Sequence, residues 1–152
     1  MQVRSVGRPR GVSAARHALA LVALLLVLGC GATRVAPYEE HVEAAVVELQ
    51  PALDRFLTEA ALDPGSASYA HAAGFYTGCA LRLRTTLMWA RSHPHNDETV
   101  EQLELMLENL ESLRAAHESG PLDPAACRVF RDMFNTGWTA ILTLELAKKR
   151  GD

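Results

Sequence analysis

Apolar residues recur along most of the chain with the period of an α-helix, and no stretch shows the strict alternation of a β-strand. Four stripes follow one another at spacings of mostly three and four residues. Their members are Val42, Val46, Leu49, Leu53, Phe56 and Ala60; Tyr69, Ala72, Tyr76, Cys79, Leu83, Thr86 and Ala90; Leu103, Met106, Leu110, Leu113 and His117; and Cys127, Phe130, Phe134, Gly137, Ile141 and Leu144. The pattern predicts four amphipathic helices around a common core.

Turn residues place the ends of the first two helices. The first stripe crosses Pro51 without a break, so we expect one helix over about 38–61 with a kink at the proline. The second helix begins near Ser66 or near Gly74, because the glycines in this region weaken its first turns. It ends at the segment SHPHND, since a residue before proline leaves the helical region.

Capping residues mark the other two helices more clearly. Asn96 or Asp97 is a suitable N-cap for the third helix, and Asp123 followed by Pro124 opens the fourth. Four helices joined by short connections predict an all-α, antiparallel up-down four-helix bundle over residues 38–150.

Three glycines lie within the predicted helices, at positions 74, 78 and 137. A small residue on a helix seam lets two backbones approach closely, or leaves space for an apolar ligand. Close packing is the interpretation we prefer for all three.

The first thirty residues follow a different pattern. Ala18 to Leu28 is a run of eleven apolar residues, which as a helix would extend about 17 Å, against ~30 Å for the hydrocarbon layer of a membrane. Four arginines precede this run, and the first acidic residue of the chain is Glu39. A basic start, a short apolar core and a small-residue exit are typical of a secretory signal peptide.

The exit of this run, Val27-Leu28-Gly29-Cys30, resembles the lipobox of bacterial lipoproteins. The resemblance covers residues 1–30 and implies that residues 1–29 are removed, that the Cys30 thiol is diacylated and that the new α-amine is acylated. Leu28 departs from the family pattern, which more often has a smaller residue there. The alternatives are an ordinary signal peptide cleaved near GCGA, or an uncleaved anchor.

Acylation of Cys30 would give effectively permanent anchoring, because two acyl chains already suffice. Residues 30–37 would then be the acylated cysteine and a short linker. Gly31, rather than an aspartate, follows the cysteine, and by the sorting pattern of enteric bacteria this favours the outer membrane. We therefore expect a lipid-anchored protein of the bacterial cell envelope that faces the periplasm.

Cleavage would leave an acidic domain. Four of the 15 basic residues precede Cys30, so 11 remain against 18 acidic residues, and the net charge is about −7. Binding to nucleic acid requires cations clustered on one face, so we expect no nucleic-acid partner.

Cys79 and Cys127 are the cysteines that remain beside Cys30. Two cysteines in an oxidising compartment predict one disulfide, with two buried thiols as the alternative. Whether this disulfide can form depends on where the second helix begins. The cysteines are level only if the second helix begins near Gly74, whereas a start at Ser66 offsets them by almost 15 Å, too far for a disulfide.

Histidines give the best lead to chemistry. His93, His95 and Asp97 share the connection between the second and third helices, and an up-down bundle brings His41 to the same end. Imidazoles with a carboxylate are ligands of zinc, copper or nickel, so a divalent-metal site is one interpretation. A solvated loop whose histidines flank a proline is the other.

Catalytic motifs are missing from the sequence: it has no nucleophile elbow, no glycine-rich phosphate loop after a strand and no Glu-x-x-His pair after Cys30. We expect a protein that is not an enzyme and needs no cofactor. Its helical domain would act as a binding or scaffolding module with a protein partner in the envelope. A periplasmic bundle that binds a metal or a small ligand is the alternative.

Overall fold

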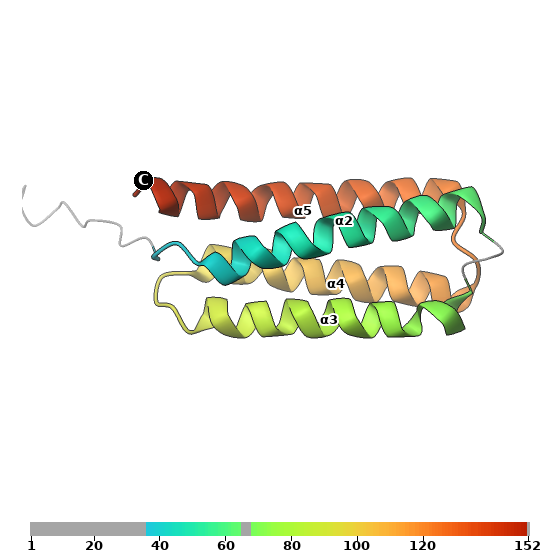
Figure 1. Ribbon diagram of the computed structural model, residues 1–152, viewed down its shortest axis with the longest axis horizontal. Helices are drawn as coiled ribbons and strands as arrows, with labels where there is room; N and C mark the ends of the chain where they lie inside the picture. The colour runs from blue at the N-terminus through green and yellow to red at the C-terminus, as the bar shows by residue number, and fades with distance from the viewer. Residues whose placement is uncertain (1–35, 65–67, 152) are drawn as a thin grey trace, which may run out of the picture. The chain divides into compact units, whose positions relative to one another are not determined.

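The computed structural model describes residues 36–64 and 68–151, so the predicted signal peptide and Cys30 lie outside the described residues. Val35–Asp152 form one compact unit. It contains four helices, and successive helices run in opposite directions, as the colour sequence in Figure 1 shows. Helix α2 packs against α3 and α5, and α4 packs against the same two neighbours. The predicted all-α four-helix bundle is confirmed.

Helices α2 (Glu40–Leu62) and α3 (Tyr69–Arg91) form the first antiparallel pair. Helix α2 continues through Pro51, as predicted. Ser68 is the N-cap residue of α3, without a capping hydrogen bond from its side chain, so of the two predicted starts the one near Gly74 is wrong. Since Pro51 lies on the exposed side of α2, the hydrogen bond that it cannot donate is lost next to solvent.

Helices α4 (Asp97–Ser119) and α5 (Pro124–Arg150) complete the bundle. Asp123 caps α5, and its carboxylate accepts a hydrogen bond of 2.7 Å from the backbone N–H of Ala126. Gly151 ends α5 in the left-handed conformation, with φ 80°. Capping by Asp123 and termination at Gly151 depend only on neighbouring residues, so the ends of α5 are easy to predict from the sequence.

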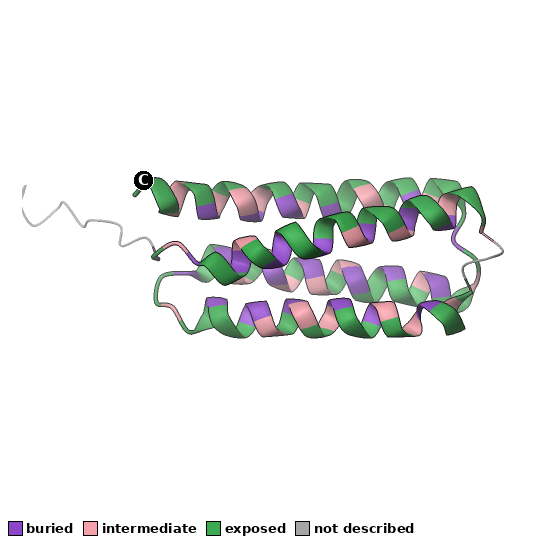
Figure 2. Cartoon of the chain, viewed as in Figure 1, coloured by how far each residue is buried: buried purple, intermediate pink, exposed green. Residues whose placement is uncertain are grey.

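The core lies between the four helices, and buried residues recur along the length of each of them (Figure 2). It contains most members of the predicted apolar stripes. On α5 the buried stripe consists of Cys127, Phe134, Trp138, Ile141 and Glu145. The prediction placed Gly137 and Leu144 on this stripe, one residue before the buried Trp138 and Glu145.

Cys79 and Cys127 are buried free thiols, so the predicted disulfide is not formed. Because α3 begins at Tyr69, Cys79 lies ten residues into its helix, whereas Cys127 lies three residues after Pro124. At ~1.5 Å per residue this offsets the cysteines by about 10 Å along two helices that run in the same direction. Helices α3 and α5 also occupy opposite corners of the bundle. The Cα separation of a disulfide is only about 6 Å.

None of the helices described in the structure is both long enough and apolar enough to cross a lipid bilayer.

Candidate functional site

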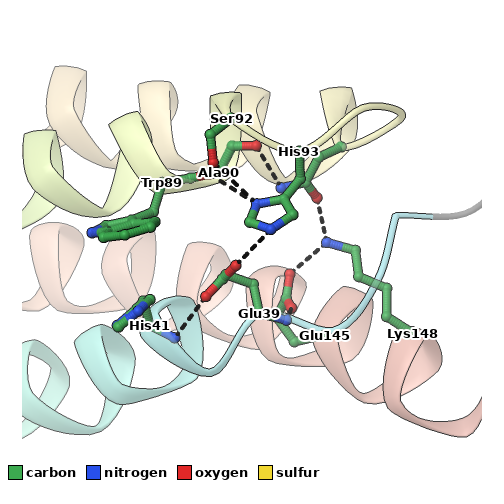
Figure 3. A network of polar contacts seen from close by, with 9 residues as sticks. Glu39, His41, Trp89, Ala90, Ser92, His93, Glu145 and Lys148 are labelled. Carbon is green, nitrogen blue, oxygen red and sulfur yellow. Dashed lines mark hydrogen bonds and ion pairs between the residues drawn. The ribbon is translucent and has the colours of Figure 1, made fainter.

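A cluster of polar side chains lies at the end of the bundle where α2 begins and α5 ends (Figure 3). The start of α2, the α3–α4 connection, the first turn of α4 and the last turns of α5 each contribute to it. At its centre is Glu145, a side chain only 1% exposed. A carboxylate buried in a helical core requires hydrogen-bond partners for both oxygens, and the other residues of the cluster provide them.

Lys148 is the counter-ion of this buried carboxylate. Its Nζ lies 2.5 Å from Oε1 of Glu145, and the lysine side chain is 5% exposed. The ammonium also donates to Oγ1 of Thr99 at 2.7 Å and to Oδ1 of Asn96. All three ammonium hydrogens therefore have acceptors, which is the condition for burying a lysine in its charged form.

The remaining groups of the cluster are paired as well. Thr99 donates its hydroxyl hydrogen to Oε1 of Glu145 at 3.1 Å, and the backbone N–H of Glu39 donates to Oε2 at 3.0 Å. The Asn96 amide donates to the carbonyl of Ala90 at 2.9 Å, so the N-cap residue of α4 also fastens the end of α3. A network paired at every member rigidifies the elements that it joins.

Glu39 extends the network to the predicted histidines. Its Oε2 lies 3.2 Å from Nε2 of His93, and its Oε1 accepts the backbone N–H of His41 at 3.3 Å. The other ring nitrogen of His93, Nδ1, lies 3.1 Å from the carbonyl oxygen of Trp89. Both ring nitrogens of His93 thus lie within hydrogen-bonding distance of an oxygen atom of the protein.

The structure brings His41 and His93 to the same end of the bundle, as predicted, but their rings have other contacts. The His41 ring stacks on Trp89, with 4.6 Å between ring centroids. His95 is exposed in a left-handed backbone conformation with φ 63°, and Asp97 is exposed in the first turn of α4. In the part of the chain described here, no group of three His, Cys, Asp or Glu side chains is arranged to hold a metal ion.

Tyr38 and Lys149 close the outer side of the cluster. Nζ of Lys149 lies 4.7 Å from the centre of the Tyr38 ring, and the Tyr38 hydroxyl donates to Glu43. This hydrogen bond raises the pKa of Tyr38 to about 12, and it lowers the pKa of the Glu43 carboxyl. The residues before α2 are therefore fastened to both α2 and α5.

The thiols and the buried tyrosine lie deeper in the core and carry no sign of activation. Burial raises the pKa of Cys79 to about 11, and it also raises the pKa values of Cys127 and Tyr76. A nucleophilic cysteine needs the opposite shift, which a nearby cation or a helix N-terminus supplies. Tyr76 instead shares a hydrogen bond of 2.9 Å with Nδ1 of His117 inside the core.

Sequence reasoning missed Glu145 and Lys148 as members of a site. Glu145 lies four residues after Ile141 and seven after Trp138, which continues the core stripe, and Lys148 follows one turn later. An acidic residue on a core position with a lysine three residues on was the available signal. From its position alone, a lysine in the last turn of a helix is explained as a partner of the helix dipole, so it does not point to a site.

Comparison of the chain with protein-family models, with curated proteins and with solved structures finds no match. The chemistry of this site therefore rests on its own geometry. The paired charges leave the central carboxylate engaged on both oxygens, an arrangement suited to holding chain segments together.

Proposed function

We propose that the protein is a lipid-anchored binding or scaffolding module of the bacterial cell envelope, without catalytic activity of its own. The observation that carries this proposal is the cysteine of VLGC at the end of an eleven-residue apolar run. Cys30 precedes Ala36 by six residues, which reach about 20 Å at most. An anchored bundle would therefore remain close to the membrane, which we take to be the outer membrane on its periplasmic side.

The attachment of the residues before α2 supports a mechanical role for the polar cluster. Ala36 is 3% exposed, and the Glu39 backbone is bonded to Glu145 on α5. A force or a restraint applied through Cys30 would thus reach both α2 and α5. In this proposal the polar cluster is the base that orients the bundle relative to its anchor.

The side chains of the described residues favour binding over catalysis. The central carboxylate is engaged, and the raised pKa of each buried cysteine keeps its thiol protonated at neutral pH. Large apolar side chains are exposed on each helix, including Val47, Leu81, Leu105 and Val129. Exposed apolar side chains of this kind provide contact area for a protein partner when they gather at an interface.

Site-specific photo-crosslinking in living cells tests the binding role. A photoreactive residue is placed at Val47, Leu81, Leu105 or Val129, one position on each helix, in the full-length chain. We expect a discrete crosslinked product at one position or at two neighbouring ones, because a specific partner covers one side of the bundle. Absence of a product at all four positions, or equal products at all four, would contradict a specific binding module.

A further inference from the structure

A groove lies between the C-terminal half of α2 and the first turns of α3. These parts of the two helices are at the end of the bundle opposite the start of α2 and the end of α5 (Figure 1). Its volume is about 390 Å³, within the range of sites for small molecules. The lining comes from the facing sides of both helices, principally from Ala52, Arg55, Phe56, Glu59, His71 and Phe75.

The floor of the groove is aromatic. The rings of Phe56 and Phe75 are stacked with centroids 4.7 Å apart, and both side chains are partly exposed. Tyr76 packs behind Phe56 at 5.5 Å in an edge-to-face arrangement, which holds the exposed rings in place. Ala52 lies one turn before Phe56, and its short side chain leaves room beside the rings. A flat apolar body would therefore meet a preformed aromatic surface.

The rim of the groove is polar and carries the guanidinium group of Arg55. Arg55 is exposed and makes no ion pair within the described part of the chain, whereas most of the other arginines there are paired. Nδ1 of His71 lies 2.8 Å from the hydroxyl of Ser68, so when that hydroxyl donates, Nε2 carries a hydrogen and is a second donor. Glu59 on the same rim offsets part of the positive charge.

We propose that this groove binds a small aromatic carboxylate, with its ring against Phe56 and Phe75 and its carboxylate on Arg55. A guanidinium matches a carboxylate with two parallel hydrogen bonds. One arginine with a glutamate nearby suits a single negative charge rather than two. This inference goes beyond the binding of a protein partner and does not depend on the lipid anchor.

Calorimetry with 2-naphthoate tests the proposal on the full-length chain in phospholipid vesicles, with empty vesicles as the blank. We expect saturable binding that Arg55→Gln weakens about threefold, in line with an exposed ion pair. Glu59→Gln should tighten binding about twofold, because it removes a like charge from the rim. Arg150→Gln is the matched control: this exposed arginine lies in the last turn of α5, at the other end of the bundle, and its substitution should leave the affinity unchanged.

The apolar part of the groove is tested by Ala52→Trp, which should abolish binding by filling the space beside the rings. Circular dichroism checks that each variant folds, and the two rim variants keep the test valid if Ala52→Trp does not. Uncharged 2-naphthalenemethanol should bind more weakly than 2-naphthoate and should not respond to Arg55→Gln. No saturable binding, equal effects of the Arg55 and Arg150 variants, or a preference for 2-naphthylmethylammonium would each overturn the proposal.

Discussion

Glu145 is a buried charged residue, and its need for partners determines the contacts at one end of the bundle. Its carboxylate occupies a core position, so leaving it without Lys148 would strand a charge among helices. Removing one partner of a buried ion pair typically costs about 3–5 kcal/mol, whereas an exposed pair contributes at most about 1 kcal/mol. Lys148 and its neighbour Lys149 represent these two cases in adjacent residues.

We expect Lys148→Met to lower the free energy of unfolding by about 3 kcal/mol, and Lys149→Met by no more than about 1 kcal/mol. Lys149 is the matched control because its side chain is 55% exposed and lies 3.7 Å from Glu43. Urea denaturation measures both. The double variant Glu145→Leu with Lys148→Met should lose less stability than the sum of its single variants. Equal effects of the two lysine variants would show that the buried pair is not a structural element.

The thiol of Cys79 predicts a dependence of stability on alkaline pH. Burial raises its pKa to about 11, above the ordinary value of 9.0. The folded protein therefore retains this proton to higher pH than the unfolded chain, so the contribution is complete below about pH 9 and is lost as the pH rises towards 11.

Between pH 9 and 11 the wild type should lose about 2 kcal/mol more stability than Cys79→Ala. Urea midpoints determined at both pH values provide the measurement. The comparison cancels the deprotonation of lysines and tyrosines, which both proteins share. Identical losses in the two proteins would mean that the Cys79 thiol is not shielded from water.

At the scale of elements, the glycines of α3 and α5 have different surroundings. A Cβ atom added to Gly137 would lie 2.2 Å from Sδ of Met106, whose side chain is fully buried. Cβ atoms added to Gly74 and Gly78 would meet nothing within 4 Å. Close packing therefore explains Gly137, as the sequence predicted, whereas that explanation is wrong for the two glycines of α3.

Alanine substitutions should therefore have opposite effects in the two helices. Gly74→Ala and Gly78→Ala should each stabilise the protein by about 0.5–1 kcal/mol, because alanine has the higher helix propensity. Gly137→Ala should destabilise it by about 1–3 kcal/mol through overpacking against Met106. Thermal unfolding followed by circular dichroism distinguishes these signs. A stabilising Gly137→Ala would contradict the close approach of α4 and α5.

The sequence predicts the extents of the helices well and the side-chain contacts between helices less well. Caps such as Asp123 and periodic apolar stripes act within a few residues, so they are visible in a single segment. The contacts of Glu145 come from residues 46 and 106 positions away, which no local pattern specifies. The same limit applies to the histidines, because stacking of His41 on Trp89 depends on how α2 and α3 pack.

At the scale of the whole molecule, the proposal places the base of the bundle next to a membrane. We expect the full-length protein, expressed in a bacterial host, to remain with the outer-membrane fraction after a high-salt wash. Cys30→Ser should release it into the soluble fraction or leave it uncleaved, because the acylated thiol would be lost. Separation of membranes by density, followed by immunoblotting, measures this. A Cys30→Ser protein that partitions like the wild type would contradict anchoring through Cys30.

The most direct test of the central claim is mass spectrometry of the N-terminal peptide of the protein purified from bacterial membranes. We predict that the mature chain begins at Cys30 and carries a diacylglyceryl group on its sulfur and an acyl chain on its α-amine. The tandem spectrum should lose these lipids as fatty-acid fragments. An N-terminus after Cys30, or a chain that begins at Cys30 with a free thiol, would contradict the lipid-anchored module proposed here.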